Sequence, residues 1–244
     1  MKRIIRYFRA LVGIFHFGRA GTFTRTFELT KFDHDFKVSW SQGGEDLALL
    51  SIFLNQPEGT YIDVGAHHPS RFSVTRHLYQ SGWSGLNIEA NRELIQEFQA
   101  KRNRDRSIVG YVGTPGIRKF HIFSEPAIST SDVSVASSLV EHDRKLLEII
   151  EVEAVPLRKL LDEHFPQKQI DLVNIDAEGS DFDVLTSLDF ESLEKDRWPK
   201  YLLLETKPPV TRALETKSVS YAMSYGYNPV LVLPMSTILQ SPFI

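Results

Sequence analysis

The sequence has no cysteine, and this absence removes disulfide bonds, thiolate metal sites and cysteine nucleophiles from the chemistry to consider. It also has little net charge, −3 over 244 residues, so nothing in its overall charge favours binding to nucleic acid. It contains no internal repeat and no low-complexity segment. Apolar residues make up 42% and charged residues 24%, which is typical of a globular protein with one large domain. We expect a cytoplasmic protein.

The first 38 residues differ from the rest, because basic side chains accumulate there before the first acidic one, Glu28. The apolar run 10–17 is too short for a membrane span of about 20 residues, and no clear signal-peptide cleavage site follows it. Two alternatives stay open: an interfacial helix that contacts a membrane of anionic lipid, or an amphipathic helix packed on its own domain or on a second subunit. We therefore divide the chain into an N-terminal basic and apolar extension, residues 1–38, and a domain, residues 39–244, and leave the oligomeric state open.

From Ser39 onwards, predicted helices alternate with short apolar strands. The predicted strands span residues 61–66, 85–90, 107–112, 119–123, 152–155, 170–176, 201–205, 229–233 and 237–239, and the main predicted helices span residues 41–54, 73–80, 92–101, 180–188 and 210–225. This alternation predicts an α/β fold with a mostly parallel central sheet and helices on both faces. Ligands bind such sheets beyond the carboxyl ends of the strands, so the residues that end each strand are the first candidates for a site.

One stretch breaks this alternation. Residues 128–139 are rich in serine and valine and show no helical period, which predicts a mobile loop. Six hydroxyl side chains lie in this stretch, and it could close over a hydroxyl-rich acceptor as a lid or simply face solvent.

Two acidic residues end adjacent predicted strands. Asp63 lies just before Gly65 and Ala66, and it can accept a hydrogen bond from an ammonium or amide group of a ligand that the glycine lets approach. Glu89 follows 26 residues later, where an acid suits the two hydroxyls of a ribose. The alternatives are that Asp63 binds loop backbone groups and that Glu89 caps the next helix. The dinucleotide fingerprint G-x-G-x-x-G is missing, so the pair predicts a nucleoside site of another kind.

Four motifs together resemble the FkbM family of S-adenosylmethionine-dependent methyltransferases. They are S-Q-x-G-E-D at residues 41–46, the strand and turn at residues 61–69, G-W-x-G-x-N-I-E at residues 82–89, and I-D-x-E-G at residues 175–179. The resemblance implies a Rossmann-like methyltransferase fold, S-adenosylmethionine as the cofactor, and mostly O-methylation, often of sugars, glycan-like compounds or polyketides. It does not fix the acceptor. The His67-His68-Pro69 stretch departs from the common glycine motif of methyltransferases but is familiar within this family.

Asp176 and Glu178 follow a central predicted strand and face the predicted cleft. Either could take a proton from an acceptor hydroxyl or orient it, and the alternative is that both only bind loop backbone groups. Ser180 and Asp183 have the S-x-x-D spacing of a helix cap, which predicts a structural role for Asp183 and for Asp181 beside it.

His67 and His68 lie at the same predicted edge of the cleft. A neutral imidazole is a plausible base, so one of them is the second candidate for the proton acceptor. A metal held by these histidines together with Asp176 and Glu178 is an alternative, but adjacent histidines usually point in different directions. Nothing fixes a ligand set, and we expect turnover without a metal.

Residues 41–46 begin the helix before the first strand. Ser41 is predicted to cap that helix, and Glu45 and Asp46 suit the positive end of its dipole. Capping accounts for these residues without any function. The family resemblance nevertheless implies a role in cofactor or substrate binding for Gln42 and Glu45.

The sequence therefore predicts an S-adenosylmethionine-dependent methyltransferase that acts on a hydroxyl of a small molecule or glycan, with no nucleic-acid partner. Two alternatives remain: a non-catalytic member of the same fold that binds a glycan or a protein, and another nucleotide-dependent enzyme such as a dehydrogenase. The missing glycine fingerprint disfavours the dehydrogenase. Calorimetric titrations with S-adenosylmethionine and with NAD distinguish the three.

Overall fold

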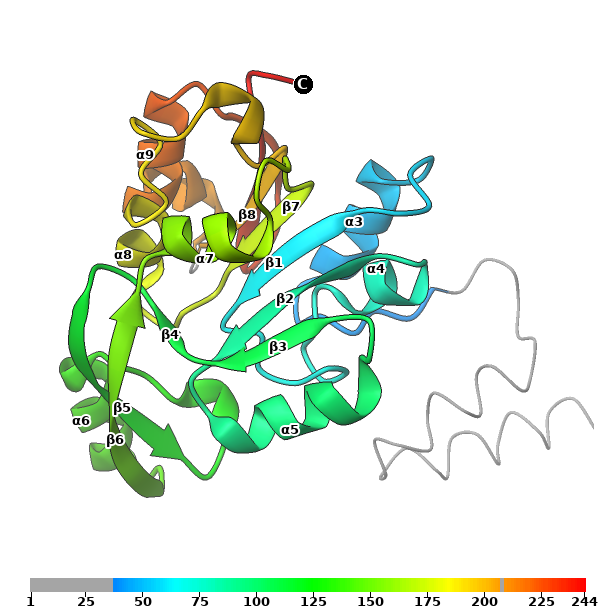
Figure 1. Cartoon of the computed structure of the whole chain (residues 1–244). Coiled ribbons are helices and arrows are strands. Elements are labelled where there is room, and N and C mark those ends of the chain that lie inside the picture. The colour runs from blue at the N-terminus through cyan, green and yellow to red at the C-terminus, as the bar shows by residue number, and fades with distance from the viewer. Residues whose placement is uncertain (1–36, 207–208) are drawn as a thin grey trace, which may run out of the picture. The chain divides into compact units, whose positions relative to one another are not determined.

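Seven strands form the central sheet of the computed structural model, which describes residues 37–206 and 209–244 (Figure 1). The strands are β1 (Thr60–Val64), β2 (Ser84–Glu89), β3 (Arg106–Val109), β7 (Leu172–Ile175), β8 (Tyr201–Glu205), β9 (Asn228–Val232) and β10 (Ser236–Gln240). Their order across the sheet is β3-β2-β1-β7-β8-β10-β9. Neighbours from β3 to β8 run parallel, and β10 is antiparallel to both of its neighbours. The predicted α/β fold with a mostly parallel sheet is confirmed.

Helices cover both faces of this sheet. The central strands β1 and β7 are buried along their whole length, which explains their almost continuous apolar sequences. On one face, Ile62 belongs to the core that includes side chains of α7 (Leu157–His164), α8 (Asp181–Thr186) and α9 (Lys217–Ser224). On the other face, Tyr61 belongs to the core that includes α3 (Glu45–Ile52) and α4 (Arg76–Gln80). The helix α5 (Arg92–Lys101) joins this second face, because Arg102 at its end donates a hydrogen bond to the Tyr61 hydroxyl.

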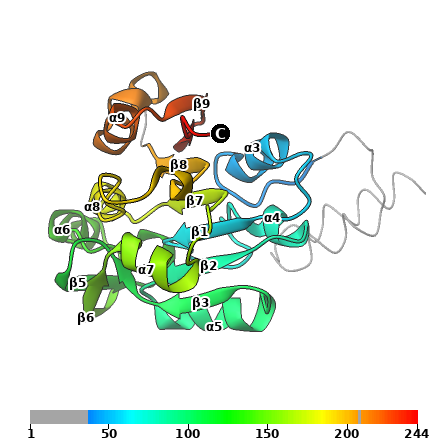
Figure 2. The same ribbon diagram turned by 45° about the horizontal axis from the view of Figure 1, so that its top comes forward.

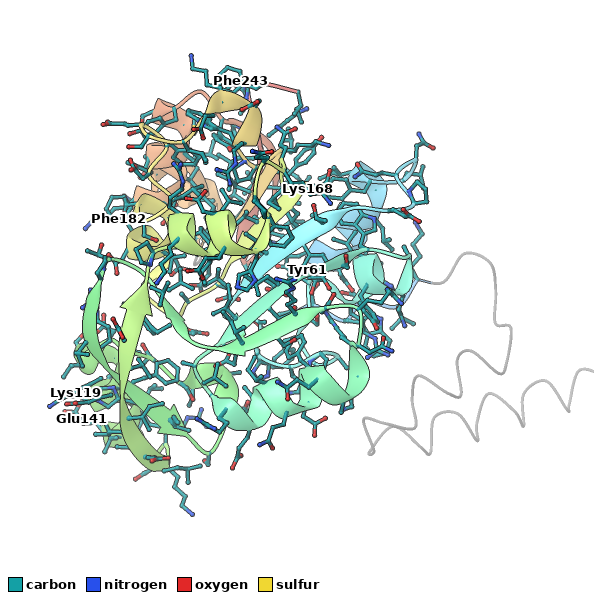
Figure 3. All side chains as sticks on the ribbon, in the orientation of Figure 1. Tyr61, Lys119, Glu141, Lys168, Phe182 and Phe243 are labelled. Atoms are coloured by element: carbon teal, nitrogen blue, oxygen red, sulfur yellow. The ribbon has the colours of Figure 1, made fainter. Side chains whose placement is uncertain are left out.

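A second, three-stranded sheet lies to one side of the central sheet (Figures 1 and 2). It consists of β4 (Tyr111–Val112), β5 (Gly116–Phe123) and β6 (Leu146–Val155) in the order β4-β6-β5. Between β5 and β6 the chain forms a short 3₁₀ helix, η1 (Pro126–Ile128), and a helix, α6 (Val133–Glu141). We call residues 111–155 the small-sheet unit. Figure 3 shows Lys119 and Glu141 at the outer edge of this unit, whereas Tyr61 lies in the interior of the molecule.

The predicted mobile loop at residues 128–139 is wrong, because most of this stretch is helical. Asp132 caps α6 by accepting hydrogen bonds from the backbone amides of Ser134 and Val135. Ala136, on the inner face of α6, is buried. Serine and valine have only modest helix propensity, so the sequence gave no periodic signal. The cap and the buried alanine stabilise the helix instead.

Several other element boundaries also differ from the prediction. The single strand expected at residues 107–112 is interrupted at Gly110, so that β3 and β4 belong to different sheets. The short strand expected at residues 152–155 is the end of the longer β6. The helix expected at residues 210–225 is a 3₁₀ helix, η3 (Val210–Glu215), followed by α9, because Thr216 between them has an extended backbone. A further 3₁₀ turn, η2 (Lys195–Arg197), precedes β8.

Residues 1–36 of the predicted N-terminal extension lie outside the described residues, and so do the interfacial helix and the packed helix that were its two alternatives. In the part of the chain that the structure describes, no helix has both the length and the apolar character needed to cross a membrane.

Candidate active site

A cavity opens at the carboxyl ends of β1, β2, β7 and β8, and the small-sheet unit forms one of its walls. In Figure 1 the arrowheads of β1 and β2 point towards that unit. The cavity brings together most of the residues that the sequence singles out, namely Gln42, Glu45, Asp63, Gly65, Ala66, His67, Glu89, Asp176 and Glu178. His68 is the predicted site residue that does not line it.

Asp63 lies at the bottom of the cavity, only 2% exposed, and connects three segments of the chain. One carboxylate oxygen accepts a hydrogen bond from the Asn174 amide on β7, at 2.8 Å, and the other accepts one from the Thr75 hydroxyl, at 2.7 Å. Burial raises the pKa of Asp63, and these two hydrogen bonds oppose that rise. Asp63 therefore fixes the geometry of the strand ends, and any contact with a ligand uses the remaining lone pairs of its oxygens.

The turn after β1 passes very close to the turn after β7. Gly65 has a φ of +73°, and a Cβ on this residue would lie 1.8 Å from the carbonyl oxygen of Asp176. Only glycine fits this approach. The backbone amides of Gly65 and Ala66 both donate to the carbonyl of Ile88, at 3.0 and 3.1 Å. These two amides are thus occupied within the protein.

Glu89 ends β2 with a buried carboxyl group, 8% exposed, that lines the cavity. Its two oxygens accept hydrogen bonds from the backbone amides of Asn91, at 2.8 Å, and His67, at 3.1 Å. Burial raises its pKa to about 7, although the backbone hydrogen bonds oppose this rise. Glu89 does not cap α5, because the Asn91 side chain does so by accepting from the Glu93 amide. The carboxyl group therefore remains directed at the cavity.

The two adjacent histidines have different surroundings. His67 lines the cavity, and its ring stacks on Phe72 with centroids 5.9 Å apart. Both of its ring nitrogens are buried without a hydrogen-bond partner among the described residues, and burial lowers its pKa to about 4. His68 instead accepts backbone hydrogen bonds from Ser70 and Arg71 through Nδ1. Only His67 is therefore placed to act on a ligand as a neutral base.

The turn after β7 is held in a strained conformation. Glu178 has a φ of +45°, a backbone angle that residues other than glycine rarely adopt. Asp181, at the start of α8, accepts hydrogen bonds from the backbone amides of Ala177 and Gly179, at 2.9 and 3.3 Å. Thr130 of the small-sheet unit donates to the carbonyl of Glu178 at 2.8 Å. The backbone on both sides of Glu178 is therefore fixed.

The capping box predicted for Ser180 and Asp183 is wrong. Ser180 does precede α8, but its side chain makes no cap hydrogen bond. Its hydroxyl accepts a hydrogen bond from Tyr111 at 2.5 Å, and Asp183 accepts one from the Thr114 hydroxyl at 2.6 Å. Both side chains therefore connect α8 to the region around β4 and β5, which the sequence pattern did not reveal.

Three carboxylates converge beyond the ends of β7 and β8. One oxygen each from Asp176, Glu178 and Glu205 lies within 4.8 Å of the other two. Asp176 is open to solvent through the cavity, but protein surrounds it elsewhere. This partial removal from water, followed by repulsion from Glu205 and Glu178, raises the pKa of Asp176 well above its usual value. Such a set can bind a proton or orient a hydroxyl group, and carboxylates are also the ligands that hard metal ions prefer.

Gln42, just before α3, and Glu45, in the first turn of α3, also line the cavity. The predicted cap at Ser41 is wrong, because Gly44 precedes α3 and the Ser41 hydroxyl donates to Asp46. Glu45 lies in the first turn of α3 as predicted, and one of its oxygens accepts a hydrogen bond from Ser236 on β10 at 3.1 Å. Glu45 therefore attaches the start of α3 to β10, and Gln42 lines the same cavity.

Sequence reasoning missed several residues that shape the site. Glu205 ends β8 after an apolar run, which is the same signal that identified Glu89. Tyr111 lines the cavity just after the break at Gly110, where the predicted continuous strand concealed it. Asn174 lies on β7 beside Asp63, and only the pairing of β1 with β7 brings the two together.

Comparison with known families gives one match. The sequence profile described as the methyltransferase FkbM domain matches residues 63–210. This span contains Asp63, Glu89, Asp176, Glu178 and Glu205, and it leaves out Gln42 and Glu45. A search of curated proteins found no match.

Solved structures with a similar arrangement of elements include two methyltransferases. A TehB-like SAM-dependent methyltransferase from Corynebacterium glutamicum is 9% identical, with a TM-score of 0.40 over 93% of this chain and 98% of that one. A precorrin-6y C5,15-methyltransferase from Geobacter metallireducens is 13% identical, with a TM-score of 0.41 over 85% of this chain and 92% of that one. These values are too low to say anything about the substrate.

Proposed function

Because the chain belongs to the methyltransferase FkbM family, we propose that it transfers a methyl group to a hydroxyl of a sugar, a glycan or a related small molecule. The family uses S-adenosylmethionine, so the chain is a methyltransferase with this cofactor. The acceptor and its hydroxyl are the proposed part. They are supported by the chemistry of the groups that line the cavity.

The cavity residues fit the cofactor. Glu89 presents a buried carboxylate whose oxygens each hold one backbone donor, and each oxygen can accept one more hydrogen bond. A buried carboxylate with acceptor capacity left on both oxygens suits the two hydroxyls of a ribose. Gln42 carries an amide that can donate to a carboxylate, which is the anionic group of the cofactor's amino-acid part.

The turn after β1 does not suit the dinucleotide that a dehydrogenase binds. Dinucleotide folds bind the diphosphate with free backbone amides at a glycine-rich turn that leads directly into a helix. Here the amides of Gly65 and Ala66 donate to Ile88, and α4 begins only at Arg76. This geometry disfavours the dehydrogenase alternative.

The observation that carries the hydroxyl proposal is the position of Asp176 and Glu178. They follow β7, which lies two strands from β2 and Glu89, with Gly65 at the end of the strand between. Neighbouring strands are about 4.8 Å apart, so the acids lie about 10 Å along the sheet edge from the ribose-binding carboxylate. This spacing lets one elongated cofactor span the strand ends with its reactive end near the acids.

Bound S-adenosylmethionine supplies an activated methyl group for in-line displacement by a nucleophile. A hydroxyl is a weak nucleophile, so the protein must orient it and accept its proton. Asp176 is the group best placed for this step, with Glu178 next to it. His67 is the second candidate, since its imidazole is neutral and lies in the same cavity.

Apolar side chains in the cavity support an acceptor with an apolar face. Phe72, Phe120, Pro126 and Ala127 line the cavity, and Phe72 is stacked against His67. A sugar ring combines hydroxyls, which donate hydrogen bonds to carboxylates, with CH groups that pack against such a wall. A cavity lined by both carboxylates and aromatic rings suits this combination.

Substitution of the acids tests the proposal. Asp176→Asn or Glu178→Gln is expected to lower kcat by about 10²–10⁴-fold, with Asp176 the more sensitive, while the Kd for S-adenosylmethionine changes little. The matched control is Asp183→Asn, an acid of α8 whose partner is Thr114 rather than the cavity. Methylated products are identified by mass spectrometry against a glycan library, and kcat is then measured with the acceptor found.

The outcomes separate the candidate groups. Near-native kcat in both acid variants and a loss in His67→Asn would assign the base to His67 instead. Near-native kcat in all variants would mean that the cavity only positions a reactive acceptor. The same assay is run with a strong chelator, where we expect turnover to continue, and activity that returns only with Mg²⁺ would show that the three carboxylates hold a metal.

A further inference from the structure

Glu178 owes its position to contacts outside its own loop. Its backbone lies in the left-handed region, with a φ of +45°, which is unfavourable for a residue with a side chain. Strained backbone of this kind persists only where surrounding structure holds it, and it clusters at functional sites. Other contacts must therefore hold the backbone of Glu178, whose side chain lines the cavity.

Two segments provide those contacts. From α8, Asp181 accepts from the amides that flank Glu178, those of Ala177 and Gly179. From the small-sheet unit, the Thr130 hydroxyl donates to the carbonyl of Glu178 itself at 2.8 Å. The first contact is local in sequence and belongs to the start of a helix. The second joins residues 48 positions apart.

Thr130 is itself firmly held. It is 1% exposed, and its backbone exchanges two hydrogen bonds with His121 on β5, at 2.8 and 3.1 Å. The next residue, Ser131, contacts the Ser180 hydroxyl at 2.8 Å, and Tyr111 donates to the same hydroxyl. The small-sheet unit is therefore attached to the strained turn at two points, the carbonyl of Glu178 and the hydroxyl of Ser180.

We propose that Thr130 is a positioning residue for methyl transfer, which holds Glu178 in the conformation that directs its carboxylate at the acceptor. This inference rests on the proposed function, because it requires that Glu178 act on the acceptor. Under it, the small-sheet unit does more than form a wall of the cavity: it sets the geometry of the chemical step.

The test is Thr130→Val, which keeps the shape of the buried side chain and removes the hydroxyl. A misplacement of about 1 Å at a reacting group can cost about 100-fold in rate, so kcat is expected to fall about 10- to 100-fold. The Kd for S-adenosylmethionine and the acceptor KM should change less than about twofold, because uniform binding is not affected. Thr130→Ser restores the hydroxyl and is expected to restore kcat.

The matched control is Thr114→Val. Thr114 also donates its hydroxyl to the region of α8, at 2.6 Å, but its partner is Asp183 and not the strained turn. Its kcat is expected to stay near the native value. The Thr130 hydroxyl also accepts the amide of Asp132, but Asp132 caps α6 through its own side chain, so the helix keeps its start. Far-UV circular dichroism and thermal unfolding check the fold of each variant.

A double variant decides whether Thr130 acts through Glu178. If it does, adding Thr130→Val to Glu178→Gln should cause little further loss of kcat. Full additivity, or a serine variant as slow as the valine variant, would overturn the inference. Loss of kcat in Glu178→Gln but not in Thr130→Val would overturn it while leaving the proposed function standing. Full kcat in Glu178→Gln would also overturn the inference, and the proposed function would then rest on Asp176 or His67. Failure to find any methylated product would overturn the proposed function. If the valine variant does not fold, Thr130→Ala provides the same comparison.

Discussion

Glu89 combines a buried carboxyl group with two backbone donors, and these contacts fix its direction. Glu89→Ala is expected to weaken S-adenosylmethionine binding by about 1–3 kcal/mol, because ribose donors would be left unpaired in a buried place. Isothermal titration calorimetry measures this change. The control is Glu93→Ala, an exposed acid in the first turn of α5. Unchanged affinity in a folded Glu89→Ala protein would refute the assignment of the ribose to Glu89.

The raised pKa of Glu89 predicts that cofactor affinity depends on pH. Because burial raises this pKa to about 7, the carboxyl is ionised above that pH and protonated below it. The ionised form accepts more hydrogen bonds, so affinity should fall as the pH drops through 7. If only the ionised form binds, the apparent Kd at about pH 6 is about tenfold higher than at about pH 8. Calorimetry across this range measures it, and Glu89→Ala should flatten the profile. Tighter binding at the lower pH would argue against this account.

For single residues, the sequence predicts which side chains line the cavity where those residues end strands, and it fails where two partners are distant in the chain. Glu89 and Asp176 end apolar runs, and this pattern predicts their position at the cavity. Glu205 has the same signal but was not singled out. His67 and His68 are equivalent in sequence, and only the turn that uses His68 Nδ1 to accept two amides distinguishes them.

The loop between β1 and α4 is held in place by hydrogen bonds from one side chain of another element. Arg102, at the end of α5, is 2% exposed and donates to the Pro69 carbonyl and to the hydroxyls of Ser73 and Thr75. Its guanidinium also lies 3.8 Å from the carboxylate of Asp105. This loop carries His67 to the cavity, so the anchor belongs to the scaffold of the site.

Arg102→Leu is expected to destabilise the protein by about 3–5 kcal/mol, because it removes the cation beside the buried Asp105 carboxylate and takes the donor from several buried oxygen atoms. Urea unfolding followed by circular dichroism measures the change. Arg104→Leu is the control, since Arg104 is exposed on the same turn and its substitution should cost no more than about 0.5 kcal/mol. Equal stabilities of the two variants would contradict the anchoring role of Arg102.

Elements with strong periodicity were predicted well, and those with specific local contacts were not. The buried strands β1, β2, β7 and β8 are apolar runs with clear ends. The helix α6 depends on the Asp132 cap and on a single buried alanine, which a search for apolar periodicity does not detect. The separation of β3 from β4 depends on Gly110, where the chain leaves one sheet for another.

For the whole molecule, alternation of strands and helices was enough to predict the layered sheet, but not the small-sheet unit. That unit depends on pairings such as Tyr111 with Ala154, which link segments far apart in sequence. Its contribution to the site therefore became visible only in three dimensions.

The N-terminal extension should be dispensable for cofactor binding. The residues described as lining the cavity begin at Gln42, so deletion of residues 1–36 is expected to leave the Kd for S-adenosylmethionine unchanged. Calorimetry tests this, with sedimentation and vesicle flotation to detect changes in association or lipid binding. A truncated chain that folds but no longer binds the cofactor would show that the extension belongs to the site.

The pairing of β1 with two very different partners has a consequence for how the protein is made. Asp63 on β1 lies beside Asn87 on β2, which follows soon in the chain, and beside Asn174 on β7, 111 positions away. During synthesis the side of the cavity that carries Glu89, where we propose that the ribose binds, can form long before the side that carries Asp176 exists. Under the proposed arrangement the cofactor spans both sides, and its binding is then expected to stabilise the completed sheet and not the early half. Until β7 has been made, one edge of β1 has no neighbouring strand. The newly made chain then depends on its own core, or on chaperones, to keep this edge from pairing with other strands.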